Sequence, residues 1–204
     1  MPDFGDTNVS HETLEYLAAY ARELLKWNKR INLVGRATTD DVMSRHIDDS
    51  LQVYDAVENP TGIWCDLGSG GGLPAIVVAI CARETALEVV CVESDTRKSA
   101  FLSHMARLLD LNVRVIIGRI EAVDPIKADI ISARALAPLE KLLTFAERHA
   151  KPHGVCLFPK GETLQSEIHR ASEEWQFSLE AIPSRTSSRS AILKITDIAR
   201  VERT

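Results

Sequence analysis

The sequence predicts an α/β protein with a mostly parallel, seven-stranded sheet and an N-terminal helical extension. From residue 61 onward, short apolar runs alternate with stretches of helical periodicity, which is typical of parallel strands buried on both faces. The first run ends in a glycine-rich turn at residues 68–72, where doubly wound sheets commonly bind a ligand. The turn signal Asn-Pro-Thr-Gly at residues 59–62 separates an extension of residues 1–60 from a domain of residues 61–204.

The extension contains two predicted helices after a loose tail of residues 1–10. The first covers residues 11–27, where apolar side chains recur at helical spacing and Ser10 suits the N-cap position. Residues 27–37 break this period. The second predicted helix covers residues 39–57 and carries His46 on its apolar face.

The domain then alternates strands with helices. Apolar runs bounded by turn residues predict strands at 63–67, 87–93, 113–117, 130–133, 155–158, 177–182 and 190–195. Helical periodicity between the strands predicts helices at 74–83, 96–110, 138–150 and 162–175. Pro74 suits the first turn of its helix, because an amide hydrogen there has no partner within the helix.

The composition is that of a globular protein. The 204 residues are 45% hydrophobic and 26% charged, which excludes disordered and low-complexity classes. No apolar window is long enough to cross a bilayer and the N-terminus does not resemble a signal peptide, so we expect a cytoplasmic protein. The four cysteines lie in apolar stretches outside any C-x-x-C pair; we expect buried, reduced thiols and no metal site.

The glycine-rich turn indicates a ligand that approaches the main chain closely. A dinucleotide fingerprint, G-x-G-x-x-G, requires a third glycine, but Leu73 stands in that place after Gly68 and Gly70. A turn that merely closes a strand–helix unit is disfavoured, because four glycines in five residues cost conformational entropy on folding. The turn therefore predicts a nucleotide-like ligand, and the missing third glycine disfavours NAD.

The alternating pattern Asp66-x-Gly68-x-Gly70-x-Gly72 resembles the first motif of class I S-adenosylmethionine methyltransferases. Glu93 ends the second predicted strand, where a carboxylate can accept hydrogen bonds from both hydroxyls of a ribose. Because adenosyl and NAD riboses would suit it equally, Glu93 does not separate the two cofactors. Asp66 and the missing third glycine favour S-adenosylmethionine.

Six segments, in order and spacing, resemble those of one family over roughly residues 14–195. They are Trp27-Asn28-Lys29-Arg30-Ile31-Asn32-Leu33, His46-Ile47-Asp48-Asp49-Ser50, the turn from Asp66 to Pro74, Arg97-Lys98-Ser99-Ala100-Phe101-Leu102, Ser132-Ala133-Arg134-Ala135 and Lys160-Gly161. The family is the bacterial small-subunit ribosomal RNA methyltransferase G, also called the glucose-inhibited division B family. The resemblance implies a Rossmann-like class I fold that methylates nitrogen 7 of one guanine in 16S rRNA, with S-adenosylmethionine as the donor.

The resemblance also implies site residues. Glu93 would hold the ribose, and the backbone of Ile120 and Glu121 would contact the adenine edge. Arg134 follows the fourth strand, near the methyl group and the incoming base. The implied cofactor-binding residues are Gly68, Gly70, Leu73, Glu93, Ile120, Glu121 and Arg134.

Guanine nitrogen 7 carries a free lone pair, so its methylation requires no general base. The expected catalysis is in-line positioning of that nitrogen against the sulfonium methyl group. Arg134 is the candidate catalytic residue, and two roles for it stay open. It either fixes a phosphate or the guanine oxygen, or it braces the cofactor carboxylate or a neighbouring loop.

The RNA-contacting surface is less sharply indicated, because the net charge is −5 and a basic cluster is often only a solvated face. Lys and Arg nevertheless outnumber Asp and Glu in two windows, residues 22–46 and 185–204. With the family resemblance, we expect RNA contact from at least one window. The candidate RNA-binding residues are Lys29, Arg30, Lys160, Arg185 and Arg189.

Polar residues of the extension are interpreted as a network that docks it over the methyl-transfer site, not as catalytic groups. The members are Asn28, Asn32, His46, Asp48 and Ser50. Trp27 is interpreted as a core anchor, with base stacking as the lesser alternative.

Alternative functions share parts of this pattern. A class I methyltransferase of proteins or small molecules would have the same turn and Glu93, but would lack the segments at residues 27–33 and 46–50. An NAD-dependent oxidoreductase is disfavoured by Leu73, and a nonenzymatic module would bind cofactor without turnover. The expected partner is 16S rRNA in the small subunit or in an assembly intermediate, and the expected state is a monomer.

Overall fold

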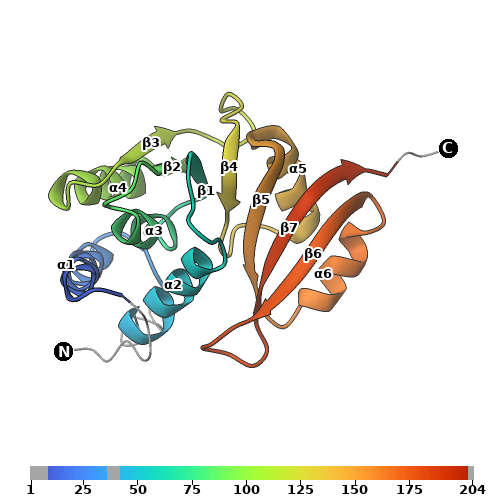
Figure 1. Cartoon of the computed structure of the whole chain (residues 1–204). Coiled ribbons are helices and arrows are strands. Elements are labelled where there is room, and N and C mark those ends of the chain that lie inside the picture. The colour runs from blue at the N-terminus through green and yellow to red at the C-terminus, as the bar shows by residue number, and fades with distance from the viewer. Residues whose placement is uncertain (1–8, 36–41, 202–204) are drawn as a thin grey trace.

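The computed structural model describes residues 9–35 and 42–201 (Figure 1). The first helix, α1 (His11–Asn28), begins as predicted at Ser10, whose side-chain oxygen accepts a 3.1 Å hydrogen bond from the Thr13 amide. The second predicted helix is divided. Its beginning at residues 39–41 lies outside the described residues, and a π-helical segment, η2 (Val42–Ile47), then runs into α2 (Asp48–Asp55).

The seven strands form one sheet in the order β3-β2-β1-β4-β5-β7-β6, which runs from left to right in Figure 1. The first five strands in this order run parallel to one another, whereas β7 is antiparallel to both β5 and β6. The prediction of a mostly parallel seven-stranded sheet is therefore confirmed. The strands are β1 (Ile63–Leu67), β2 (Glu88–Glu93), β3 (Val113–Ile117), β4 (Ala128–Ser132), β5 (Ala150–Lys160), β6 (Trp175–Pro183) and β7 (Ala191–Arg200).

Successive strand residues pack into two separate cores, one on each face of the sheet. Trp64 of β1 and Val89 of β2 belong to one core, and their neighbours Cys65 and Val90 belong to the other. Residues of α1 to α4 pack into the first core, and residues of α5 and α6 into the second. The remaining helices are α3 (Ala75–Cys81), α4 (Thr96–Leu108), α5 (Leu139–His149) and α6 (Leu164–Ala171).

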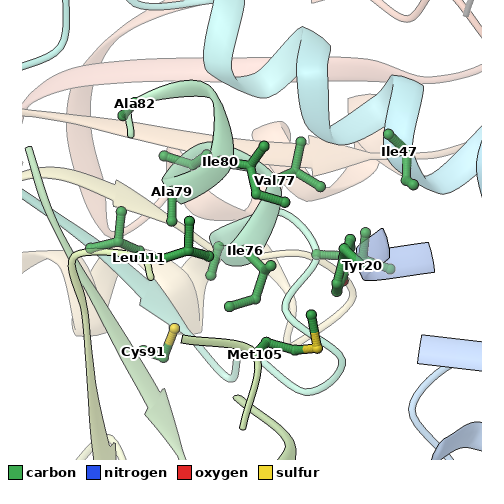
Figure 2. Packing of buried hydrophobic residues seen from close by; sticks show 14 of the residues in the cluster. Tyr20, Ile47, Ile76, Val77, Ala79, Ile80, Ala82, Cys91, Met105 and Leu111 are labelled. Carbon is green, nitrogen blue, oxygen red and sulfur yellow. The ribbon is translucent and has the colours of Figure 1, made fainter. Parts of the chain in front are cut away.

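Helix α3 lies inside the protein. Its residues 75–80 are all buried, because α1 and α2 contact it and the sheet lies beside it. Ile76, Val77 and Ile80 contribute side chains to a cluster that also contains Tyr20 of α1 and Met105 of α4 (Figure 2). A helix that is apolar all round requires such cover, so α1 and α2 complete the first core.

The boundaries that differ from prediction have tertiary causes. The helix predicted at 162–175 ends at Ala171, because Trp175 begins β6 and pairs with Arg200 of β7. Pairing with neighbouring strands also extends β5, β6 and β7 beyond their apolar runs. Pro74 occupies the N-cap of α3, one position before the first turn where it was predicted. Cys65, Cys91 and Cys156 are buried, as predicted, whereas Cys81, also predicted to be buried, is partly exposed at the end of α3.

Candidate functional site

The glycine-rich turn connects β1 to α3 at the carboxyl end of the parallel strands. Gly68, Gly70 and Gly72 have φ angles of +67°, +52° and +83°, which side chains rarely adopt. A Cβ atom on Gly72 would lie 2.4 Å from Ile76 Cγ1, and one on Gly68 would lie 2.7 Å from Leu136 Cδ1. Backbone conformation and space both require glycine at residues 68 and 72.

Hydrogen bonds hold this turn from two sides. The Gly68 amide donates to the carbonyl oxygen of Val92 at 2.8 Å. The Gly70 amide donates to Glu93 Oε2 at 2.8 Å, and the Asp95 amide donates to Glu93 Oε1 at 2.8 Å. The carboxylate at the end of β2 is thus held by both oxygens beside the turn.

A cavity of about 460 Å³ opens beside the turn. The backbone of Ile120, which lines this cavity, is fixed by a hydrogen bond: His149 Nε2 lies 2.9 Å from the Ile120 carbonyl oxygen. Glu121 is exposed and pairs with Lys141 Nζ at 3.1 Å. Five of the predicted cofactor-binding residues line this cavity: Gly68, Glu93, Ile120, Glu121 and Arg134. The other two lie behind it, since Gly70 bonds Glu93 and Leu73 is packed in the first core.

A second cavity, of about 500 Å³, adjoins the first. It is lined by residues of α2, by the end of β5 and by the β6–β7 loop, residues 184–190. Residues 134–138 line both cavities, and we call them the shared wall. Two adjoining cavities with a common wall can hold a molecule that donates a chemical group beside the molecule that accepts it.

Arg134 is the charged residue of the shared wall. Its Nη1 donates a 3.0 Å hydrogen bond to His46 Nδ1 and lies 3.9 Å from Asp49 Oδ2. An arginine only donates hydrogen bonds, so Nδ1 of His46 carries no proton in this arrangement. Burial lowers the pKa of the Arg134 guanidinium, which nevertheless stays charged in a protein.

Asp66 lies beneath the glycine turn, almost fully buried. Its Oδ1 accepts a 2.6 Å hydrogen bond from Ser132 Oγ, which in turn accepts one from Trp64 Nε1 at 2.9 Å. Desolvation raises the pKa of the Asp66 carboxyl to about 6, because its hydrogen bonds compensate only in part. The carboxylate supports the turn from inside the sheet and does not line either cavity.

The candidate RNA-binding residues are placed differently from one another. Lys29 and Arg30 are exposed after α1. Arg185 pairs with Asp55 at 2.9 Å, and Arg189 pairs with Glu162. Lys160 lines the second cavity but is nearly buried. Arg36 and Arg203 of the two basic windows lie outside the described residues.

The polar residues that were expected to form one network near the N-terminus connect to one another only in part. Asn28 Oδ1 accepts hydrogen bonds from the backbone amides of Leu33 and Val34, and Ser50 Oγ donates to the His46 carbonyl oxygen, so both act locally. Asn32 is exposed, whereas His46 reaches Arg134. Trp27 packs on Phe101 and His104 with ring centroids 5.5 and 5.3 Å apart, which confirms it as a core anchor.

Sequence reasoning missed three residues that fix the site: Tyr20, Gln52 and Glu167. Gln52 Nε2 donates to the Pro183 carbonyl oxygen at 2.6 Å, and its Oε1 accepts from the Arg185 amide at 2.9 Å. These partners lie more than 100 residues away along the chain. A signal within the sequence therefore could not have revealed them.

Within residues 9–35 and 42–201, no group of three His, Cys, Asp or Glu side chains is placed to hold a metal ion. In the same part of the chain, every helix is too short or too polar to span a membrane.

Comparison with known proteins identifies relatives over nearly the whole chain. A family model described as rRNA small subunit methyltransferase G matches residues 13–192. A ribosomal RNA small subunit methyltransferase G from Ruegeria pomeroyi is 48% identical over 98% of this chain and 99% of its own. One of the same name from Cereibacter sphaeroides is 50% identical over 95% of this chain and 94% of its own.

Solved structures share the fold at low sequence identity. The M. jannaschii TYW2 in complex with AdoMet has a TM-score of 0.58 and 16% identity, with 76% of each chain covered. A ribosomal protein L11 methylase from Lactobacillus delbrueckii subsp. bulgaricus has a TM-score of 0.60 and 18% identity, over 78% of this chain and 79% of its own. The fold is therefore that of class I methyltransferases.

Proposed function

Because this chain belongs to the rRNA small subunit methyltransferase G family, we propose that it methylates nitrogen 7 of one guanine in 16S rRNA, with S-adenosylmethionine as the donor. The observation that carries the proposal is the shared wall, which puts a cavity beside the glycine turn next to a second cavity under the β6–β7 loop. One cavity suits a cofactor and the other a base taken out of its RNA stack.

The first cavity fits S-adenosylmethionine by its chemistry. When bound, this cofactor supplies an electrophilic methyl group on a sulfonium. Each oxygen of Glu93 accepts one backbone hydrogen bond and keeps a further lone pair, so the carboxylate can also accept from ribose hydroxyls. Ile120 offers an apolar surface for a purine ring, and Gly68 keeps the turn free of a side chain that would meet Leu136. Glu121 and Arg134 complete the lining, with Gly70 and Leu73 holding the turn from behind.

The second cavity supplies groups that orient an acceptor without removing a proton from it. Arg134 lies on the boundary of both cavities and donates hydrogen bonds, so it suits the guanine oxygen or a phosphate. Asp49 lines the second cavity beside Arg134 and offers a carboxylate that can balance the positive charge of a 7-methylguanine product. These groups position and stabilise; none acts as a general base.

We propose that RNA binds the protein surface that surrounds the second cavity. Arg185 and Arg189 belong to the β6–β7 loop, and their ion pairs are exposed, so a phosphate can displace the carboxylate at little cost. Lys29 and Arg30, which are exposed after the end of α1, are proposed as further RNA-contacting residues. We further propose a cytoplasmic monomer whose substrate is the small subunit or an assembly intermediate, with residues 1–60 as an extension packed on the domain of residues 61–204.

The test is transfer of radiolabelled methyl groups from S-adenosylmethionine to unmodified small subunits and to their protein-free RNA, with the site mapped by cleavage at 7-methylguanine. Labelling of a single guanine is the expected result. If no RNA form is labelled although S-adenosylmethionine still binds, the rRNA assignment is contradicted. A protein or a small molecule would then be the favoured methyl acceptor.

A further inference from the structure

Lys160 and Glu167 form a nearly buried ion pair at the edge of the second cavity. Lys160 Nζ donates to Glu167 Oε2 and to the Ala137 carbonyl oxygen, both at 2.7 Å. The two side chains are only 10% and 11% exposed. Two of the three ammonium donors are thus used inside the protein.

Glu167 also caps a helix that is distant in sequence. Its Oε2 accepts a 2.9 Å hydrogen bond from the amide of Leu139, the first residue of α5. Pro138, at the N-cap, provides no side-chain hydrogen bond, so this amide would otherwise be an unpaired buried donor. A carboxylate at a helix N-terminus also interacts favourably with the helix dipole. Glu167, from α6, therefore substitutes for the missing cap, and Thr163 Oγ1 holds its other oxygen at 2.7 Å.

Both backbone groups held by this pair belong to the shared wall or to the residue that follows it. The Ala137 carbonyl and the Leu139 amide flank Pro138, so the pair fixes the wall at its carboxyl end. Leu136, at the centre of the shared wall, fills the space beside Gly68 of the glycine-rich turn. A displacement of the wall would therefore reach both cavities.

We infer that Lys160 and Glu167 are positioning residues that fix the shared wall, and that the Lys160 ammonium serves this purpose in place of the phosphate contact predicted from sequence. The inference deepens the proposed function and rests on it. Moving Lys160 out to an RNA phosphate would leave the Glu167 carboxylate and the Ala137 carbonyl without their partner in a nearly dry site, which is strongly unfavourable.

The two roles of Lys160 make opposite predictions for Glu167. A positioning pair requires both partners, so Lys160→Met and Glu167→Gln should each weaken S-adenosylmethionine binding and lower kcat, by about 10-fold to 100-fold for a misplaced wall. The double variant should be no worse than the worse single variant, because the interaction is already lost. Lys160→Arg should be impaired too, because the larger planar group does not fit both acceptors.

The experiment measures S-adenosylmethionine affinity by calorimetry, kcat on unmodified subunits, and RNA affinity over a salt series. Lys151→Met is the matched control, since Lys151 also lies on β5 and pairs with Asp129 at 2.7 Å, but lines neither cavity. Glu167→Gln keeps an acceptor for the Leu139 amide and so retains the fold, which a thermal melt checks. Unchanged salt dependence of RNA binding in Lys160→Met, together with weaker cofactor binding in Glu167→Gln, is the expected pattern.

The inference is overturned if Glu167→Gln binds cofactor and turns over like the parent, or if Lys160→Met reduces the salt slope of RNA binding by about 1, as loss of one phosphate contact does. Full activity of Lys160→Arg also overturns it. The calorimetric readout involves no RNA. Failure of the parent protein to methylate rRNA would therefore contradict the proposed function, but would not decide the role of Lys160 and Glu167.

Discussion

The phenol oxygen of Tyr20 donates a 2.6 Å hydrogen bond to the carbonyl oxygen of Gly71. Tyr20 lies in α1 and is fully buried, and burial raises the pKa of its phenol, so it remains a donor at every physiological pH. Gly71 leaves little room for a side chain, since a Cβ would lie 3.2 Å from Leu24 Cδ1 and from the Leu33 carbonyl oxygen. Helix α1 thus braces the glycine-rich turn through Tyr20.

Tyr20→Phe should lower both stability and cofactor affinity. The ring still fills its place in the core, but the Gly71 carbonyl loses its partner, at a cost of about 1–3 kcal/mol. Urea unfolding and calorimetric titration with S-adenosylmethionine measure the two effects. Tyr54→Phe is the control, because Tyr54 lies in α2 and stacks on Trp64. Unchanged cofactor affinity in Tyr20→Phe would show that the turn holds its shape without α1.

Gly72→Ala should destabilise the protein by about 2–4 kcal/mol. The φ of +83° is unfavourable for alanine, and the new Cβ would lie 2.4 Å from Ile76 Cγ1 in the crowded first core. Gly161→Ala is the matched control, since its nearest neighbour, Ser190 Oγ, is 4.0 Å away and its φ is not positive. Chemical unfolding of the two variants compares them; equal stabilities would contradict the strain argument.

Asp66 should make stability fall as the pH rises from about 4 to about 6. Its folded-state pKa of about 6 lies above the unfolded value of 3.8, so the folded state binds more protons in this interval. The contribution is complete below the unfolded pKa and is lost as pH passes the folded pKa, a change of about 3 kcal/mol. Asp66→Asn keeps an oxygen for Ser132 Oγ but has no charge to bury.

The measurement for Asp66 is the difference in unfolding free energy between parent and Asp66→Asn at pH 4, 5, 6 and 7. Taking the difference cancels the contributions of carboxylates whose pKa is lowered, such as Asp129, which run in the opposite direction. The parent should lose stability relative to the variant as pH rises. A difference that does not vary with pH would rule out a raised pKa.

Local chemistry made much of this fold predictable. Strands β1 and β3 have the bounds that their apolar runs predict, and α1 begins at its predicted cap, because burial and capping are decided by nearby residues. The π-helical turn of η2 could not be predicted, since its apolar spacing resembles that of an α-helix over so short a segment. It carries His46 to Arg134, as π segments often do at functional sites.

The site was predictable only where a motif names its residues. Gly68 and Glu93 line the first cavity, and the sequence could single them out because a turn and the end of a strand mark them. Lys160 lines the second cavity, but its partners could not be predicted, because Glu167 acts on Leu139, 28 residues away on another element. Side chains that satisfy distant backbone groups leave no periodic or spaced signal in the sequence.

Arg134→Lys should lower kcat while leaving the fold intact. Lysine keeps the positive charge but loses the rigid, planar guanidinium whose Nη1 donates to His46 and lies 3.9 Å from Asp49. The expected loss is about 10²-fold, the size associated with a poorly positioned acceptor. Single-turnover methylation of unmodified subunits measures it, with cofactor and RNA binding determined separately. Full turnover in Arg134→Lys would assign Arg134 a bracing role only.

Gln52→Leu should weaken RNA binding without affecting the cofactor. Gln52 is 4% exposed, and its amide satisfies the Pro183 carbonyl and the Arg185 amide at the entrance to the β6–β7 loop. Leucine fills the volume but leaves both backbone groups unpaired, so the loop loses its anchor on α2. Because this loop lines the second cavity and not the first, KM for RNA should rise while S-adenosylmethionine affinity stays constant.

Exposed Gln176→Leu is the control for Gln52→Leu, since it makes the same chemical change away from the loop, on β6. Steady-state kinetics with each substrate varied in turn separates the two effects. Equal losses of cofactor and RNA affinity would mean that α2 supports the whole site, and the loop would then have no separate part in RNA binding. A selective rise in KM for RNA would instead establish the anchored loop as part of the RNA-binding surface.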